Sequence, residues 1–374
     1  RALYYLFDTM AGILVTVLNV METLRLKRPD DWHIHLRDDA YLTRTVKDAA
    51  RYFSRVLVMP NLVPPVTDVS AAVAYQQRIL AQAPADFQPL MTLYLTDATD
   101  ADTVVAAKQS GIVEAFKLYP VGATTNSAFG VNTIETLYPL FEVMEAQNIV
   151  LSIHGEVTDD EVDIFDREAF FIDTILTKIV ERFSHLRVVL EHITTREAVQ
   201  FVESSSERIA ATITAHHLLY DRNDMLVGGI KPIHYCLPVL KRNLHREALL
   251  VAATSSDTSF FLGTDSAPHP RSAKENACGC AAGCYTGHAA IELYAEAFNS
   301  IDRLERLESF ASEYGADFYG HPRNEDCIEL ILEDWQVPAQ LTFGDDDLIP
   351  TRSGESIAFR VTSGERYPLS DGVD

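Results

Sequence analysis

The stretch DWHIHLR at residues 31–37 determines how the rest of the chain is interpreted. Its two histidines, His33 and His35, are two positions apart, and residues with this spacing in a β-strand point to the same face. Two neighbouring imidazoles on one face form a typical metal-binding pair. In an α-helix the same spacing would direct the rings to different sides, so the metal site requires a strand. Because an H-x-H triplet also arises by chance, further ligands elsewhere in the chain must support it.

The composition is that of an ordinary globular protein. The chain has 374 residues, of which 47% are hydrophobic and 23% charged, and this length allows two domains or one large barrel. The formal net charge of −23 disfavours nucleic acids and anionic membranes as partners. The five cysteines are an odd number, with three clustered at 278–284. This pattern argues against a disulfide framework and indicates a reducing compartment, for which we expect the cytoplasm.

We expect residues 1–20 to form a tail outside the fold and residues 21–374 to form one domain. The apolar run at 10–20 is too short to span a bilayer, and we find no convincing signal-peptide cleavage site. Met21 is a natural start for the chain. The segment from about residue 341 contains Gly344, Pro350 and Gly354, and we expect it to pack outside the main fold as a C-terminal extension.

Short apolar runs recur along the chain and predict eight strands. They lie at 31–37, 56–59, 90–95, 115–118, 149–153, 187–190, 209–214 and 259–263. The runs show little alternation, as expected of strands that are buried on both faces. Helical spacing of apolar residues follows at 134–144, where Pro139 could kink the helix, and at 172–183, with Asp166 as candidate N-cap. Strands alternating with helices predict a (β/α)8 TIM barrel.

Polar residues gather at the carboxyl ends of these runs, where barrel enzymes carry their active sites. The candidates are His33, His35, Asn61, Lys117, His154, His192, Asp265 and His269. Each has an ordinary alternative, since a buried histidine can be a satisfied core residue, Lys117 can reach the surface and Asp265 can cap a helix. Their joint placement at strand ends favours a single site.

The candidate ligands exceed what one zinc ion needs. Four histidines, one aspartate and one lysine would all be used by two metals about 3.5–4 Å apart. A lysine ammonium has no lone pair, but burial lowers the pKa of the amine and exposes the free base. The amine of Lys117 could then add carbon dioxide, and the two oxygens of the resulting carbamate could bridge both metals.

Longer strings resemble the bacterial-type dihydroorotases of the amidohydrolase superfamily. They are RPDDWHIHLRD at 28–38, MPN at 59–61, PPVT at 64–67, KLYP at 117–120, ATTN at 123–126, HGEVT at 154–158, EHITT at 191–195 and GTDSAPH at 263–269. The resemblance extends from about residue 24 to the C-terminus. H-x-H alone occurs throughout the superfamily, whereas these strings together are specific to this one enzyme family.

The resemblance implies two zinc ions in each subunit, bridged by a carboxylated Lys117. His33 and His35 would hold the more buried metal together with Asp265, and His154 and His192 would hold the other.

The same resemblance implies the substrate contacts. The substrate carboxylate would be bound by Arg37, Asn61 and His269, and the backbone of Leu237 would contact the pyrimidine ring. A loop that closes over the substrate would have Thr124 and Thr125 at its tip. Arg37 lies two residues beyond His35, so in extended chain it would point to the same side as the ligands.

One departure concerns the cysteine cluster. Between Cys280 and Cys284 the chain is one alanine longer than the family pattern, so the alanine whose backbone contacts the substrate is either Ala281 or Ala282. The cluster could instead be a structural zinc knuckle, which the family does not use.

The resemblance implies reversible cyclisation of N-carbamoyl-L-aspartate to L-dihydroorotate with release of water, the third step of pyrimidine (UMP) synthesis. Asp265 would shuttle the proton, and the family favours a homodimer. One alternative is another cyclic amidohydrolase, a dihydropyrimidinase or hydantoinase, which would need no carboxylate grip. The other is a non-catalytic barrel scaffold, although such proteins usually lose ligands.

Overall fold

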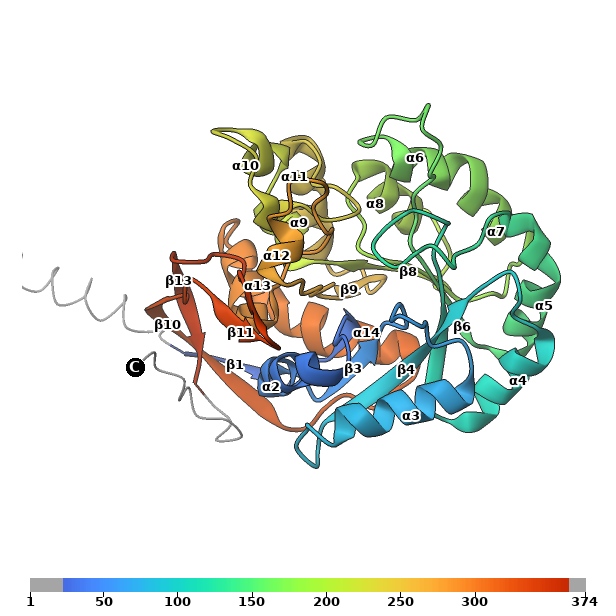
Figure 1. The fold of residues 1–374 in the computed structure, drawn as a ribbon, viewed down its shortest axis with the longest axis horizontal. Helices are drawn as coiled ribbons and strands as arrows, with labels where there is room; N and C mark the ends of the chain where they lie inside the picture. Colours follow the sequence, from blue (N-terminus) through green and yellow to red (C-terminus); the bar gives the residue numbers. More distant parts are fainter. Residues whose placement is uncertain (1–22, 363–374) are drawn as a thin grey trace, which may run out of the picture.

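The computed structural model describes residues 23–362, so the expected tail at 1–20 lies outside the described residues. Its centre is a sheet of eight parallel strands that pair in sequence order (Figure 1). The strands are β2 Asp31–Ile34, β3 Arg55–Val58, β4 Gln88–Leu95, β5 Val113–Leu118, β6 Val150–Ile153, β7 Val188–Leu190, β8 Ile209–Ile213 and β9 Phe260–Leu262. The predicted (β/α)8 barrel is confirmed.

The barrel closes through backbone hydrogen bonds just beyond its first and last strands. The N–H of Asp265 donates to the carbonyl of His33 at 2.8 Å, and the N–H of His35 donates to the carbonyl of Ser266 at 3.2 Å. A parallel bridge between Ile34 and Ser266 continues the same pairing. Closure of the barrel therefore places candidate ligands from the two ends of the sheet next to each other.

Helices lie around the sheet and cover its outer face (Figure 1). The longer ones are α2 Leu42–Tyr52, α3 Val69–Leu80, α4 Ala101–Ser110, α5 Tyr138–Gln147, α8 Arg196–Glu203, α11 Asn243–Ala253 and α13 Ala290–Asn299. Shorter segments are η1 Asp39–Tyr41, η2 Ile134–Leu137, α6 Arg167–Phe171, η3 Ile172–Leu176, α7 Thr177–Arg182, α9 Ala215–Leu219, α10 Arg222–Leu226, η4 Pro232–His234, α12 Arg271–Lys274, η5 Gly287–Ala289, η6 Leu304–Arg306, η7 Ser309–Glu313 and α14 Tyr314–Tyr319. A large cluster of buried apolar residues fills the space between strands and helices.

Two local expectations differ from the structure. Pro139 does not kink a continuous helix, because it lies in the first turn of α5, where its missing N–H costs nothing. Asp166 precedes α6 as expected, but its side chain makes no capping hydrogen bond, and the π-helical turn η3 interrupts the predicted helix. The spacing of apolar residues located both helical regions, but it did not reveal where each helix begins or that a π-helical turn interrupts the second.

Helix α14 packs against the amino-terminal end of the barrel. A second cluster of buried residues joins Tyr314, Ala316 and Tyr319 to the inward-facing side chains of the strands. The indole of Trp32 stacks on Tyr319, with ring centroids 4.4 Å apart. Because Trp32 directly precedes His33, this packing supports the strand that carries the first candidate ligand.

A small antiparallel sheet lies beside the barrel and joins the two ends of the described chain (Figure 1). It contains β1 Thr23–Lys27, β10 Cys327–Gln336 and β13 Ser356–Val361, in the order β1-β10-β13. The hairpin of β11 Leu341–Phe343 and β12 Asp346–Leu348 forms a separate two-stranded sheet. The expected C-terminal extension is thus present outside the eight-stranded sheet, and it is joined there by β1.

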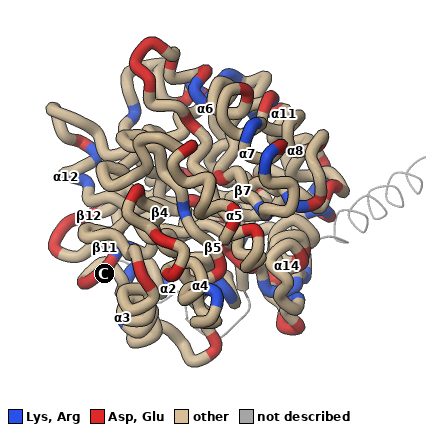
Figure 2. The backbone as a smooth tube through the Cα atoms, turned by 90° about the vertical axis from the view of Figure 1, so that its right-hand side faces the viewer, with Lys and Arg blue, Asp and Glu red and all other residues tan. Residues whose placement is uncertain are grey.

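The charged residues are spread widely over the described chain. Figure 2 shows acidic residues distributed over many loops and helices, with basic residues among them. Within residues 23–362, no helix combines the length and the apolar character needed to cross a bilayer.

The contact between α14 and Trp32 generates a prediction about Gly315. A Cβ added at Gly315 would lie 2.1 Å from the Trp32 indole nitrogen. Alanine normally stabilises a helix relative to glycine by ~1 kcal/mol, but here overpacking should dominate. We expect Gly315→Ala to lower the free energy of unfolding by about 1–3 kcal/mol, measured by chemical denaturation. Unchanged or increased stability would contradict the packing described.

Candidate metal and substrate site

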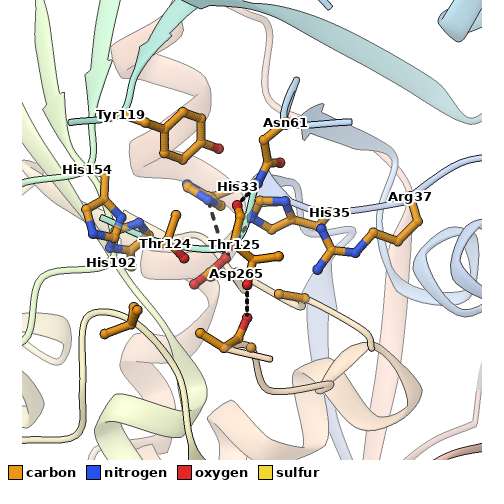
Figure 3. Close-up of a pocket in the computed structure, with 14 residues that line it drawn as sticks. His33, His35, Arg37, Asn61, Tyr119, Thr124, Thr125, His154, His192 and Asp265 are labelled. Atoms are coloured by element: carbon orange, nitrogen blue, oxygen red, sulfur yellow. Dashed lines mark hydrogen bonds and ion pairs between the residues drawn. The ribbon is translucent and has the colours of Figure 1, made fainter. Parts of the chain in front are cut away.

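The predicted site residues converge on a pocket at the carboxyl end of the barrel (Figure 3). The cavity is lined by His33, His35, Arg37, Asn61, Tyr119, Thr124, Thr125, His154, His192, Leu237, Asp265, Ala267, Ala282 and Gly283. Three expected residues are not in this lining. Lys117 is fully buried in β5, His269 contacts Arg37 and Ala282, and Ala281 does not reach the pocket.

The imidazoles form a continuous row with one carboxylate beside it. The ring centroids of His33 and His35 are 5.4 Å apart, those of His33 and His192 are 5.0 Å apart, and those of His154 and His192 are 4.8 Å apart. Asp265 Oδ1 lies 3.0 Å from His35 Nε2 and 3.5 Å from His33 Nε2. Ligand atoms of His33, His192 and Asp265 all lie within 4.8 Å of one another, which suits a metal ion.

Two buried glutamates orient the histidines. Glu191 Oε2 lies 2.8 Å from His33 Nδ1 and also accepts a hydrogen bond from Thr212 Oγ1 at 2.6 Å. Glu156 Oε2 lies 2.9 Å from His154 Nε2. A carboxylate on one ring nitrogen fixes the tautomer and leaves the other nitrogen as a free lone pair. Sequence reasoning did not assign these glutamates a role, although each adjoins a candidate ligand in the strings HGE and EH.

Several buried nitrogen atoms at this site have no hydrogen-bond partner within the described chain. They are His35 Nδ1, Lys117 Nζ, His154 Nδ1 and His192 Nδ1. Leaving a polar group buried without a hydrogen bond is costly, so a cluster of such atoms indicates that a ligand belongs there. Burial lowers the pKa of His35 to about 4 and that of His192 well below its ordinary value, which keeps both rings neutral. Neutral imidazoles are the form that binds metals, and the donor set therefore fits divalent cations.

Lys117 has the environment that carbamate formation needs. Burial lowers the pKa of its amine to about 8, even though the carboxylates of Glu191 and Asp265 act in the opposite direction. A pKa near neutrality raises the fraction of free amine, which is the species that can react with carbon dioxide.

Three site residues adopt left-handed backbone conformations. The φ angles are 58° at Arg37, 42° at His192 and 41° at Asp265. Such conformations cost about 1–3 kcal/mol for residues other than glycine and concentrate at functional sites. The expectation that Arg37 continues an extended chain is therefore wrong, because the backbone turns at this residue. Its side chain nevertheless lines the pocket.

The guanidinium of Arg37 is held by neutral partners. Its Nε donates to the carbonyl of Pro268 at 2.9 Å, and its Nη2 lies 3.1 Å from His269 Nε2. Burial and the adjacent Arg37 charge lower the pKa of His269 to about 2, so its ring is neutral. No carboxylate in residues 23–362 forms an ion pair with Arg37, which leaves a half-buried cation available to an anionic ligand.

The loop that contains Thr124 and Thr125 lies closed over the pocket. Asn61 Nδ2 donates to the carbonyl of Thr125 at 3.2 Å, and Thr125 Oγ1 donates to the carbonyl of Ala282 at 3.3 Å. Asn126 Nδ2 returns a bond to the carbonyl of Asn61 at 3.0 Å. The loop is thus tied to two other candidate substrate-binding positions.

The structure distinguishes the two candidate alanines. Ala282 lines the pocket, whereas the N–H of Ala281 donates to the carbonyl of Ala273 at 3.1 Å. Sequence reasoning missed the pocket residues Tyr119, Ala267 and Gly283. The position of Tyr119 two residues after Lys117 is a signal that could have identified it.

In a second group of potential ligands, His217 is bound within the protein, whereas neither ring nitrogen of His216 has a hydrogen-bond partner in the described residues. Ligand atoms of His216, His217 and Cys236 lie within 4.8 Å of one another. However, His217 Nδ1 lies 2.7 Å from Thr214 Oγ1, and its Nε2 lies 3.0 Å from the carbonyl of Pro238. No zinc knuckle is formed by the cysteine cluster, since no group of three thiols comes within metal-binding distance in the described part of the chain.

Comparisons with known proteins identify the family of the chain. The model of the amidohydrolase family matches residues 31–329. A dihydroorotase from Stutzerimonas stutzeri is 60% identical over 342 residues, which cover 91% of this chain and 98% of the relative. The solved dihydroorotase of Campylobacter jejuni is 35% identical with a TM-score of 0.84, covering 91% of this chain and 98% of that one. The Saccharomyces cerevisiae dihydroorotase, solved in complex with 5-fluoroorotic acid, is 32% identical with a TM-score of 0.84, covering 91% and 99%. This chain therefore belongs to the dihydroorotases of the amidohydrolase family.

Proposed function

We propose that the chain catalyses the reversible cyclisation of N-carbamoyl-L-aspartate to L-dihydroorotate, using two zinc ions in each subunit. The observation that carries this proposal is the half-buried Arg37 guanidinium, which has only neutral hydrogen-bond partners and lies at the same pocket as the histidine row. A partly desolvated cation without an ion-pair partner favours an anionic ligand, and the carboxylate of dihydroorotate supplies one.

The metals would be held by six residues from five strands, β2, β5, β6, β7 and β9. His33 and His35 would bind one ion with Asp265, His154 and His192 would bind the other, and a carboxylated Lys117 would bridge them. Bound divalent metals polarise a carbonyl group and make water a strong nucleophile at neutral pH. The open nitrogen atoms of His154 and His192 and the unpartnered amine of Lys117 support this assignment.

Asp265 would carry the proton between water and the ring nitrogen. Burial alone would raise the pKa of Asp265, but the hydrogen bond from His35 and the nearby imidazoles hold it well below its ordinary value. Asp265 is therefore ionised at neutral pH and can act as a base. In the hydrolytic direction it accepts the proton lost by the attacking water and returns it to the ring nitrogen as the C–N bond breaks. In the cyclising direction the same transfers run in reverse.

The substrate carboxylate would lie between Arg37, Asn61 and His269. A guanidinium fork matches the two oxygens of a carboxylate, which explains how a chain with a net charge of −23 binds an anion. Leu237 and Ala282 would contact the ring through their backbones, and Thr124 and Thr125 would cover it. We further propose that the enzyme acts on this small molecule as a homodimer in the cytoplasm.

The alternatives explain less of the pocket. A dihydropyrimidinase or hydantoinase acts on rings that lack the carboxylate, so Arg37 would have no anionic partner. A scaffold without activity would not need six candidate ligands at one barrel end, four of which carry nitrogen atoms without a hydrogen-bond partner in the described residues.

Loss of the bridging lysine tests the metal assignment. We expect Lys117→Ala to lose at least one of two bound zinc ions and to lower kcat by roughly 10²-fold or more, because the bridging anion is removed. Elemental analysis and a turnover assay measure both effects, and a small added carboxylic acid should restore part of each. A Lys117→Ala protein with two metals and full activity would exclude the carbamate.

Substrate discrimination tests the role of Arg37. We expect the parent enzyme to hydrolyse dihydroorotate and to be at least roughly 10⁴-fold less active on dihydrouracil, which lacks the carboxylate, because the buried charge is then left unpaired. Arg37→Met should lower kcat/KM for dihydroorotate by the equivalent of ~3–5 kcal/mol, while the metal content stays the same. If the parent prefers dihydrouracil, or if Arg37→Met is fully active on dihydroorotate, the dihydropyrimidinase alternative replaces this proposal.

A further inference from the structure

Lys274 is a buried cation whose three N–H groups all bind backbone carbonyls. It ends the short helix α12, and only 8% of the residue is exposed. Its Nζ donates to the carbonyls of Tyr235 at 2.8 Å, Ala281 at 2.9 Å and Gly283 at 2.8 Å. An ammonium group has three N–H donors, so its hydrogen-bonding capacity is filled by these three carbonyls.

The bond to Ala281 fixes the direction of the next N–H group. The Ala281–Ala282 peptide is trans, since the cis bonds in the described chain are Val63–Pro64 and Leu237–Pro238. In a planar trans peptide the carbonyl and the N–H point in opposite directions. Because the Ala281 carbonyl points at Lys274, the N–H of Ala282 points away from Lys274.

Ala282 carries the free N–H group in this segment. The N–H of Ala281 donates to the carbonyl of Ala273 at 3.1 Å, and the N–H of Gly283 donates to the carbonyl of Tyr235 at 3.0 Å. The N–H of Ala282 has no acceptor within the described residues, although Ala282 is only 8% exposed and lines the pocket. A buried donor without a partner at a pocket wall is suited to an acceptor on a ligand.

The same ammonium group joins two walls of the pocket. Tyr235 lies two residues before Leu237, and Ala281 and Gly283 flank Ala282, so Lys274 holds together the two segments that present Leu237 and Ala282 to the cavity. The carbonyl of Ala282 accepts a hydrogen bond from Thr125 Oγ1 at 3.3 Å. The peptides on either side of Ala282 are therefore fixed from both sides.

We propose that Lys274 is a positioning residue for substrate recognition, which holds the N–H of Ala282 in the orientation that donates to an acceptor oxygen of the pyrimidine ring substrate. The inference rests on the proposed function, because it requires that substrate to occupy the pocket. Lys274 itself lies outside the pocket lining and acts through the peptide that it binds.

Steady-state kinetics of Lys274→Met on dihydroorotate test the proposal. Methionine keeps most of the apolar volume and removes all three N–H donors. A hydrogen bond made to the substrate throughout the reaction contributes to uniform binding, so its loss raises KM more than it lowers kcat. We expect KM to rise by roughly 10- to 100-fold, kcat to stay within about threefold, and zinc content to be unchanged.

Lys241→Met is the matched control. Lys241 is also a buried lysine, only 4% exposed, and its Nζ donates to the carbonyl of Val239 at 3.0 Å, but it does not line the pocket. We expect this variant to lose thermal stability and to keep the parent KM. An equal rise of KM in both variants would mean general loosening of the barrel end and would overturn the proposal.

Lys274→Arg covers the case in which Lys274→Met does not fold. A planar guanidinium keeps the charge but cannot direct three N–H groups at three converging carbonyls, so we expect a KM between those of the parent and the methionine variant. An unchanged KM in either folded variant overturns the positioning role. A parent enzyme that is inactive on dihydroorotate would instead overturn the proposed function, so the two failures are distinguishable.

Discussion

Closure of the barrel is the constraint on which the site depends. The hydrogen bonds from the Asp265 N–H to the His33 carbonyl and from the His35 N–H to the Ser266 carbonyl join the last strand to the first, across more than two hundred residues of sequence. These backbone bonds also determine where the side chains of His33, His35 and Asp265 lie, so ligand spacing follows from sheet geometry. In a parallel barrel the carboxyl ends of all strands lie at the same rim, the edge of the barrel that carries the pocket. His154 and His192 therefore lie beside His33 and His35. Packing of α14 under Trp32 supports the strand at its other end.

Burial gives this rim its chemistry. Neutral imidazoles, an ionised carboxylate and a lysine with a lowered pKa coexist within one small cavity because each is removed from water and held by specific partners. Glu191 and Glu156 set ring tautomers, and Arg37 supplies a cation that the protein itself leaves without an anion. The result is a pocket with neutral imidazole nitrogens on one side and a guanidinium without an ion-pair partner in the described residues on the other, which suits the hydrolysis of an anionic cyclic amide.

The sequence predicted the architecture and most of the residues that converge at the carboxyl end of the barrel, because buried strands are visible as apolar runs and chemically distinctive residues follow them. It could not predict features that depend on backbone direction or on contacts between distant segments. The left-handed turn at Arg37 leaves no trace in residue periodicity. The choice of Ala282 over Ala281 depends on a hydrogen bond from Ala281 to Ala273, and Lys274 is recognisable only once its three carbonyl partners converge. Residues that act through backbone atoms carry no motif of their own.

The central claim is that this rim holds two metals bridged by a modified lysine. Crystals of the full chain, with diffraction data collected on either side of the zinc absorption edge, test it directly. The account predicts two anomalous peaks about 3.5–4 Å apart, one beside His33, His35 and Asp265 and one beside His154 and His192, with continuous density extending beyond Lys117 Nζ between them. A single peak, or an unmodified Lys117 side chain with both metals present, would contradict it.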